Sequence, residues 1–174
     1  MRLFFGLQPD SESALAIAAW RDRQLPLIGR PVPEANLHIT LAFLGDVSAH
    51  RLERLDQAVG EFVAQKRPPG EVLTLNQLGY WPRPGICWLG PQAWSDSLAG
   101  LARSLSRLGT AQGSKGDRGK YRPHITLLRG CDSPPPAAAS EPLFKLSFDH
   151  FNLYQSHQGR TGVTYQVLES WPLG

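Results

Sequence analysis

The sequence predicts an α+β fold in one domain, residues 1–174, in which a mainly antiparallel sheet carries its helices on one face. Three observations lead to this prediction. The length of 174 residues suits one domain of ordinary size. The predicted strands and helices mix in the order β-α-β-α-β-β-α-β-β-β, and several neighbouring strands are close enough to form hairpins. The hairpins disfavour a doubly wound parallel sheet, and a small α/β sandwich with a parallel core is the second choice.

The first part of the chain is predicted to contain two strands and one helix. Residues 2–8 form the first strand, and residues 9–11 form a turn that caps a short helix. Residues 29–36 contain two prolines and form a loop. Residues 37–44 are rich in apolar side chains and form the second strand.

The middle of the chain is predicted to form a hairpin between two helices. Apolar side chains recur at helical spacing over residues 48–66, which indicates an amphipathic helix. Residues 72–78 alternate as a half-buried strand does, and a turn rich in Pro and Gly joins them to a partner strand at 86–89. A third helix carries leucines as far as Leu108 and ends at Gly109, its expected C-cap.

The last part of the chain is predicted to be a basic loop followed by strands. Residues 115–122 hold four cations and one anion among glycines, which is typical of a loop. Residues 124–128 form a strand, and residues 134–139 form a proline-rich surface connection. The last two strands lie around residues 144–154 and 163–168.

Composition excludes several classes of protein. With 41% hydrophobic and 19% charged residues, the chain is globular and not disordered. Its apolar start is shorter than the ~7–15 residues of a signal-peptide core, and no stretch approaches the ~18 apolar residues of a membrane span. Cys87 and Cys131 cannot make a disulfide framework or a four-cysteine zinc site. We therefore expect a cytoplasmic protein with no membrane partner.

The tetrapeptide His-Ile-Thr-Leu occurs twice, at residues 38–41 and again at 124–127. Both copies lie in predicted strands, and their histidines are 86 residues apart in a chain of 174. The other three histidines lie in unrelated contexts. The repeat predicts two structurally related lobes that each contribute one copy of the motif.

Strand alternation places the polar side chains of each motif on one face. His38 and Thr40 share a face because residues i and i+2 point to the same side, and His124 and Thr126 do the same. The Ile and Leu residues between them point to the opposite, buried side. If the two lobes meet around a pseudo-twofold axis, two imidazoles and two hydroxyls converge.

Such a cluster suits phosphodiester chemistry without a metal. One neutral imidazole can take a proton from water while the other, as imidazolium, gives a proton to the leaving oxygen. The hydroxyls can hydrogen-bond the phosphate oxygens, and arginines, which are 14 of the 18 basic residues, can offset the developing charge. The sequence has no His-x-His and no His-Glu-x-x-His to hold a metal. The simpler interpretation of each motif alone is an ordinary strand with a polar face.

The chain resembles the two-histidine (2H) phosphoesterase superfamily and, within it, the RNA 2′,3′-cyclic phosphodiesterase family, also called 2′-5′ RNA ligase. The segments that carry the resemblance run nearly the whole length in family order. They are Arg2-Leu3-Phe4-Phe5, residues 36–45, Leu78-Gly79, residues 122–129, Leu153-Tyr154-Gln155-Ser156, and an ending that runs from Tyr165 to Trp171-Pro172-Leu173.

The resemblance implies a fold, an activity and a set of site residues. The implied fold is bilobal, with two pseudo-symmetric, mainly antiparallel sheets around a central cleft and helices on the outside. His38 is implied to be the general acid and His124 the general base, with Thr40 and Thr126 as phosphate ligands. Other expected substrate contacts, for each of which a surface or core role is the alternative, are Phe43, Arg122 and Arg129.

The implied reaction opens a 2′,3′-cyclic phosphate at an RNA end, such as that of a tRNA half, and leaves a 2′-phosphate. In reverse, with a 5′-hydroxyl as nucleophile, the same site would form a 2′-5′ linkage. We expect a monomer that uses neither a cofactor nor a metal. One alternative is a phosphodiesterase for small cyclic nucleotides or ADP-ribose 1″,2″-cyclic phosphate. Another is a non-catalytic RNA-binding module, although a net charge of +3 is low for strong backbone binding.

Overall fold

The computed structural model describes residues 1–117 and 119–174; of the basic loop predicted at 115–122, Arg118 lies outside the described residues. Helices and strands are mixed along the chain, as the sequence predicts. In order they are β1 (Arg2–Leu7), α1 (Ser11–Gln24), β2 (Arg30–Pro31), the short 3₁₀ helix η1 (Glu34–Asn36), β3 (Ile39–Asp46), α2 (Ala49–Lys66), β4 (Glu71–Leu75), β5 (Gln77–Trp81), β6 (Ile86–Gly90), α3 (Asp96–Ala111), β7 (Ile125–Arg129), β8 (Phe144–Phe148), β9 (His150–Gly159) and β10 (Gly162–Pro172).

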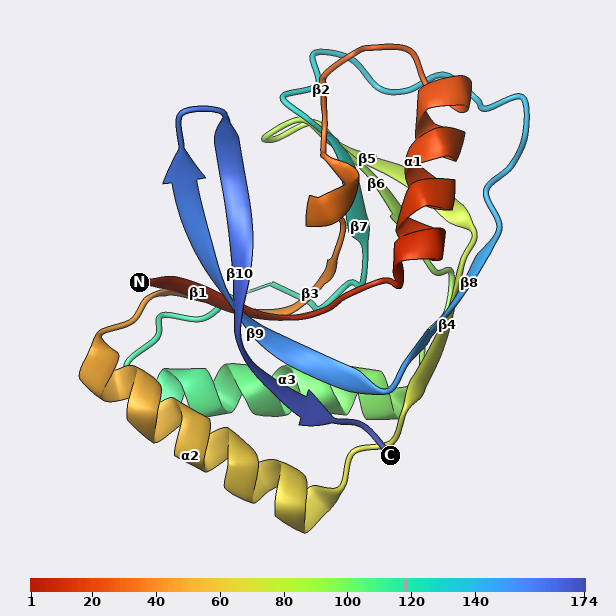
Figure 1. Ribbon diagram of the computed structural model, residues 1–174. Coiled ribbons are helices and arrows are strands. Elements are labelled where there is room, and N and C mark those ends of the chain that lie inside the picture. The colour runs from red at the N-terminus through yellow and green to blue at the C-terminus, as the bar shows by residue number, and fades with distance from the viewer. Residues whose placement is uncertain (118) are drawn as a thin grey trace.

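The strands form one large sheet and one small sheet (Figure 1). The large sheet has the order β10-β9-β1-β3-β7-β6-β5, with β2 added beside β7, and the small sheet pairs β4 with β8. Every strand pair among the described residues is antiparallel. The prediction of a mainly antiparallel α+β fold is therefore confirmed, and the second choice, a parallel core, is wrong.

The large sheet consists of two halves that are joined by a very short strand pairing. One half is β10-β9-β1-β3 and the other is β7-β6-β5. In the described part of the chain, Ile39 with Ile125 is the only ladder pair between β3 and β7. The two expected sheets are thus connected at one point, and the cleft between them opens at the motifs that surround this pair.

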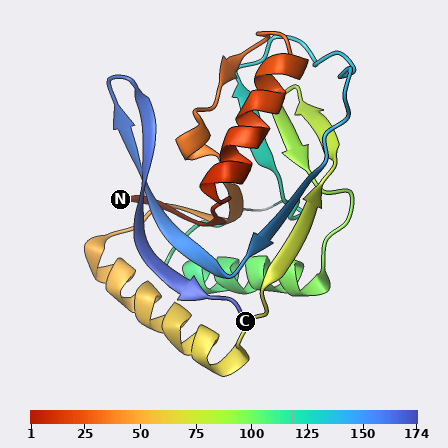
Figure 2. The same cartoon turned by 45° about the vertical axis from the view of Figure 1, so that its right-hand side comes forward.

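Each long helix begins at a residue whose side chain caps it. Asp10, Ser48 and Ser95 accept hydrogen bonds from main-chain N–H groups in the first turns of α1, α2 and α3. Helix α3 packs against β3, and α2 packs against α3 and β10. Helix α1 lies on the other half, against β8 and η1, as the two views show (Figures 1 and 2). The helices therefore do not share one face, and the outside placement implied by the resemblance is the correct one.

Two strands that the sequence predicts as continuous are divided between the two sheets. The strand expected at 72–78 is β4 followed by β5, because Asn76 leaves the ladder, donating its main-chain N–H to Gly90. The strand expected around 144–154 is β8 followed by β9, with a bend at Asp149. The chain thus changes sheets twice, which connects the small sheet to the large one.

Gly109 is not the C-cap of the third helix, which continues to Ala111. A Cβ atom at this position would lie 2.3 Å from Cδ2 of Leu44. Glycine therefore allows α3 to approach β3 closely, and the C-cap is Gln112. No helix among the described residues is long and apolar enough to cross a membrane.

Candidate active site

The two His-Ile-Thr-Leu motifs cross at the junction of the sheet halves. Ile39 and Ile125 pair there, and both are fully buried. Because the strands are antiparallel, the register places His38 opposite Thr126 and Thr40 opposite His124. The sequence predicts both histidines inside their strands, at 37–44 and 124–128, but each one lies immediately before its strand, which begins at Ile39 or Ile125. The register therefore brings the two motifs side by side at this junction.

Both imidazoles are held by the main chain in the same way. Nδ1 of His38 lies 2.8 Å from the carbonyl oxygen of Asn36, and Nδ1 of His124 lies 2.9 Å from that of Arg122. A carbonyl only accepts hydrogen bonds, so each Nδ1 carries a hydrogen atom. Nε2 is therefore the nitrogen that can gain or lose a proton at each histidine.

The two threonines differ in their contacts. Oγ1 of Thr40 lies 3.1 Å from Nε2 of His38. The main-chain oxygen of Thr40 also accepts a hydrogen bond from Tyr121 Oη, which fixes the end of the basic loop against β3. Thr126 is half-buried and stands opposite Trp88 of β6. The motifs are therefore related in backbone geometry but not in every side-chain contact.

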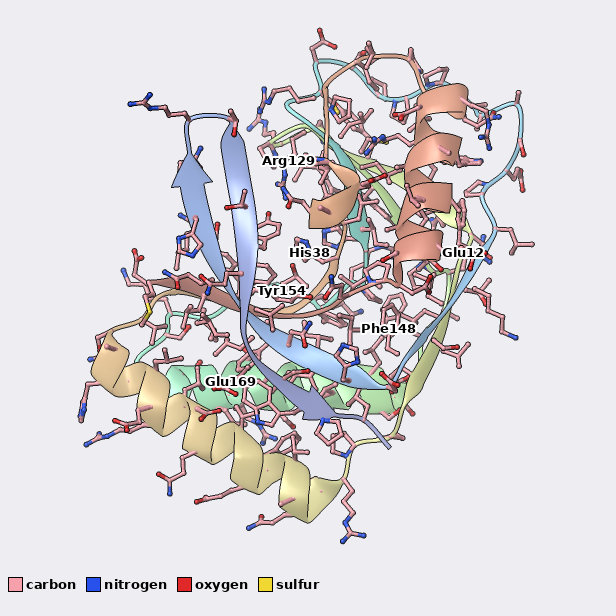
Figure 3. All side chains as sticks on the ribbon, in the orientation of Figure 1. Glu12, His38, Arg129, Phe148, Tyr154 and Glu169 are labelled. Carbon is pink, nitrogen blue, oxygen red and sulfur yellow. The ribbon has the colours of Figure 1, made fainter. Side chains whose placement is uncertain are left out.

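Aromatic rings surround each imidazole. The ring centroid of His38 is 4.8 Å from that of Phe4 and 5.0 Å from that of Tyr165, which meets it edge-on. The ring of His124 is 4.7 Å from Trp81 and 6.2 Å from Trp88. Figure 3 shows His38 beside Tyr154 and below Arg129. These rings remove water from one side of each imidazole.

This burial disfavours the charged form of both histidines. It lowers the pKa of His38 to about 4, against a weaker opposing effect of the hydrogen bond to Asn36. It also lowers the pKa of His124, again partly opposed by the hydrogen bond to Arg122. The positive charge of Arg129 lowers the pKa of both imidazoles. Both are therefore mainly neutral at pH 7 before a substrate binds.

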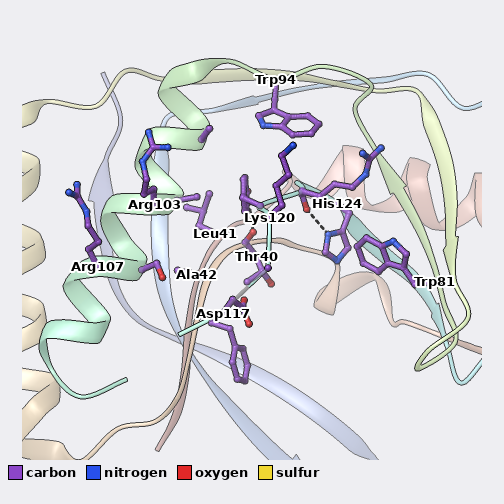
Figure 4. A pocket seen from close by; sticks show the side chains of 17 residues that line it. Thr40, Leu41, Ala42, Trp81, Trp94, Arg103, Arg107, Asp117, Lys120 and His124 are labelled. Carbon is purple, nitrogen blue, oxygen red and sulfur yellow. Dashed lines mark hydrogen bonds between the residues drawn. The ribbon is translucent and has the colours of Figure 1, made fainter. Parts of the chain in front are cut away.

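Two cavities meet at this cluster, one beside each histidine. The His38 cavity, of about 1000 Å³, is lined by His38, Thr40, Phe43 and Arg129 among others. The His124 cavity, of about 850 Å³, is lined by His124, Thr40 and Phe43 among others (Figure 4). Because Thr40 and Phe43 belong to both, the cavities are the two sides of one cleft. Thr126 lines neither of them.

The two arginines predicted as substrate contacts have different surroundings. Arg129 is exposed at the end of β7 and pairs in register with Arg30, which also lines the His38 cavity. Arg122 lines the His124 cavity, where its Cζ lies 4.7 Å from the ring of Trp88. Its Nη2 donates to Oε1 of Gln77 at 2.8 Å. Arg122 is therefore held in place and is not a solvated loop cation.

Sequence reasoning misses several aromatic residues of the site. Phe4, Tyr121 and Tyr165 contact the motifs or line the cavities, but none is predicted as a site residue. Strand alternation predicts which face of its own strand each of these residues occupies. It does not predict which other strand packs against that face. The sequence signal that could have found them is their position beside the segments that carry the family resemblance.

Among the described residues no three His, Cys, Asp or Glu side chains lie close enough together to hold a metal ion. The remaining histidines lie outside both cavities: His150 contacts Asp149, and His157 contacts Gln166. The cluster is thus a pair of imidazoles with a hydroxyl and guanidinium groups, which can move protons and bind an anion.

Known proteins resemble this chain over nearly its whole length. Residues 9–160 match the model of the 2′-5′ RNA ligase superfamily. The RNA 2′,3′-cyclic phosphodiesterase of Escherichia coli is 37% identical over 175 residues, which cover 99% of this chain and 96% of that protein. The crystal structure of E. coli LigT complexed with 3′-AMP superposes with a TM-score of 0.88 at 36% identity, covering 99% of this chain and 97% of that one. The structure of LigT complexed with phosphate gives a TM-score of 0.85 at 35% identity, with 99% and 96% coverage.

Proposed function

Because this chain belongs to the 2′-5′ RNA ligase superfamily, we propose that it opens the 2′,3′-cyclic phosphodiester at RNA ends and leaves a 2′-phosphate. The relative from E. coli bears the name of this activity and matches the full chain. The observation that carries the proposal is the paired anchoring of His38 and His124, which leaves one Nε2 free for proton transfer on each side of a shared cleft.

The reaction follows from two proton transfers. Nε2 of His124 takes a proton from water, and the water oxygen forms a bond to phosphorus. The bond between phosphorus and O3′ breaks on the opposite side, and Nε2 of His38 gives its proton to O3′. The phosphate stays on O2′ as a monoester. The assignment of acid and base follows the family resemblance. The two-sided cleft supports a separate acid and base, because the attacking and leaving oxygens need separate access.

The cations and hydroxyls stabilise the negative charge that builds up on the phosphate. Thr40 is the threonine best placed to hydrogen-bond a phosphate oxygen, since it lines both cavities. Arg129 and Arg122 supply positive charge, one from each side. Thr126 completes the set of phosphate ligands that the family resemblance implies. Phe43 lines both cavities, which supports its role as a substrate contact.

A bound phosphate also favours the protonated form of His38, the proposed general acid. The pKa of His38 is lowered to about 4 by burial, so the free enzyme holds its protonated form only rarely at pH 7. A phosphate anion beside the imidazole favours the imidazolium and raises this pKa. Substrate binding thus produces the protonated acid that the reaction requires.

The proposal is tested by incubating the protein with an RNA that ends in a 2′,3′-cyclic phosphate. Chromatography against synthetic standards then identifies the product. A 2′-phosphate end supports the proposal, and an unchanged cyclic end contradicts it. A parallel reaction with small cyclic nucleotides measures the preference for RNA ends, such as those of tRNA halves. The proposed enzyme is a cytoplasmic monomer, and sizing in solution checks the oligomeric state.

A further inference from the structure

The carbonyl groups that hold the two imidazoles lie outside the strands. The oxygen that binds Nδ1 of His124 belongs to Arg122, in the segment before β7 begins at Ile125 (the dashed line beside His124 in Figure 4). The oxygen that binds Nδ1 of His38 belongs to Asn36, the last residue of η1. A carbonyl within a ladder is held by the neighbouring strand, which these two are not. The orientation of each imidazole therefore depends on what holds Asn36 or Arg122.

Each of these two residues is tied by its side chain to an outermost strand of the large sheet. Nδ2 of Asn36 donates to the carbonyl oxygen of Val163 in β10 at 2.8 Å. Nη2 of Arg122 donates to Oε1 of Gln77 in β5, also at 2.8 Å. Strands β10 and β5 are the two ends of the strand order. In both halves, a side-chain hydrogen bond thus connects the outermost strand to the residue that holds the imidazole.

Gln77 gives the side chain of Arg122 a fixed position. The Cζ atom of Arg122 lies 4.7 Å from the ring centroid of Trp88 and 5.8 Å from that of Trp94. Trp88 lies against Gly79, where a Cβ atom would be 2.0 Å from Cζ2 of the indole. Contact with a ring face permits a guanidinium to slide across it, whereas a hydrogen bond has a preferred distance and direction. In the described part of the chain, Gln77 is the one side chain that hydrogen-bonds this guanidinium, whose Nε is buried without a partner.

We propose that Gln77 is a positioning residue for the reaction, because it holds the Arg122 guanidinium and thereby the carbonyl that orients His124. This inference rests on the proposed function. Gln77 lines neither cavity, so it acts through Arg122 and not on the substrate. Without its amide oxygen, the segment that carries the Arg122 carbonyl is less restrained and the imidazole can rotate. Nε2 is then directed at the attacking water in a smaller fraction of the molecules.

The activity test compares two substitutions at this position. Gln77→Leu has a similar size but no acceptor, so kcat on a cyclic-phosphate RNA should fall at least about fivefold, while KM stays within about twofold. Gln77→Glu keeps an oxygen for Nη2 of Arg122 and should recover most of the wild-type kcat. Gln155→Leu is the matched control. Gln155 is half-buried on β9 and lines neither cavity, so its replacement should leave both constants unchanged.

The Gln77→Glu variant also has an electrostatic readout. Burial lowers the pKa of His124, and the cations Arg129 and Arg122 lower it further. A carboxylate beside the Arg122 guanidinium offsets one of these charges, so the pH curve of kcat/KM should move to higher pH. A residue that only supported the fold would give no such shift.

A spectroscopic test observes the imidazoles without any substrate. In protein with ¹⁵N-labelled histidine at about pH 8, where the imidazoles are neutral, the ring nitrogen signals report which nitrogen carries the hydrogen atom. His38 and His124 should both be in the Nδ1–H form in the wild-type protein. In Gln77→Leu, His124 should exchange between the two forms, whereas His38, which is held by Asn36, should be unchanged.

Three results would overturn the inference. They are unchanged His124 signals in a folded Gln77→Leu variant, an equal loss of activity in Gln155→Leu, and no recovery in Gln77→Glu. If Gln77→Leu does not fold, Gln77→Asn takes its place, since it shortens the side chain by one carbon and stays polar. A wild-type protein that leaves the cyclic phosphate intact contradicts the proposed function, and the ring nitrogen signals then still decide whether Gln77 holds His124.

Discussion

Oγ1 of Thr40 lies 3.1 Å from Nε2 of His38, so the hydroxyl contacts the nitrogen that exchanges a proton with the substrate. The hydroxyl can donate to neutral His38 and can accept from its protonated form. It also lines both sides of the cleft. Thr40 is therefore in a position to hold the imidazole and the phosphate in one arrangement, whereas Thr126 lines neither cavity.

Replacement of Thr40 should cost more activity than replacement of Thr126. A lost hydrogen bond to a charged group is worth roughly 1–3 kcal/mol, so Thr40→Ala should reduce kcat/KM by about 5–150-fold. Thr126→Ala should lie at or below the lower end of this range. Thr40→Ser keeps the hydroxyl and should retain most activity. Steady-state kinetics on a cyclic-phosphate RNA checks all three, and a larger loss in Thr126→Ala would contradict the geometry.

Removal of either strand histidine should slow turnover by about 10²–10⁴, the usual contribution of one general acid or base. His38→Asn and His124→Asn are informative because the short amide can still donate to the carbonyl that holds Nδ1. The double variant should lose far less than the product of the single losses, since the pair works as a unit.

The control for this experiment is a histidine outside the cleft. His157 contacts Gln166 and lines neither cavity, so His157→Ala should retain the wild-type rate. His50→Ala, at an exposed position, serves the same purpose. A control variant as damaged as either strand variant would show that the site has been assigned to the wrong residues.

The pH dependence should follow the lowered pKa values of the two imidazoles. The reaction needs His38 protonated and His124 neutral, so kcat/KM should give a bell-shaped curve. Both limbs report the free enzyme, where burial lowers both pKa values, so the curve should be centred below 6.5. The limbs belong to the coupled pair and not to one residue.

The curve for kcat should lie at higher pH than the curve for kcat/KM, because the bound phosphate raises the pKa of the imidazoles. Arg129→Gln removes a cation that lowers both pKa values, so it should move the kcat/KM curve upward. A kcat/KM curve centred above pH 7 in the wild-type protein would contradict the burial of these side chains.

Activity should survive excess EDTA, because imidazoles and hydroxyls carry every proposed step. The comparison is made between protein dialysed against EDTA and the same sample with divalent cations restored. Loss of activity on chelation followed by recovery with a divalent cation would require a different mechanism.

The sequence predicts the motif residues well because strand alternation is a local property. Ile39 and Ile125 are fully buried on one face, and the histidines and threonines lie on the other, as the period of two requires. The repeat predicts two related lobes that each contribute one copy of the motif. What local patterns do not contain is the register between distant strands, which brings Phe4 opposite both Tyr154 and Phe43 and thus builds the wall around His38.

The local sequence pattern also does not predict that one apparent strand is divided between two sheets. Residues 72–78 alternate without interruption, but Asn76 uses its side-chain oxygen to accept from Gln92 and its main-chain N–H to donate to Gly90. These tertiary bonds end β4 and start β5. Gly109 fails as a predicted C-cap for a similar reason, since the close approach of Leu44 explains the glycine.

The most direct test of the account uses a substrate whose leaving oxygen, O3′, is replaced by sulfur. A thiolate leaves with little help from an acid, whereas activation of the attacking water is still needed. His38→Ala should therefore recover most of the wild-type rate on the 3′-thio cyclic phosphate, and His124→Ala should remain slow. Recovery in His124→Ala instead would exchange the two roles, and recovery in neither variant would contradict general acid catalysis by His38.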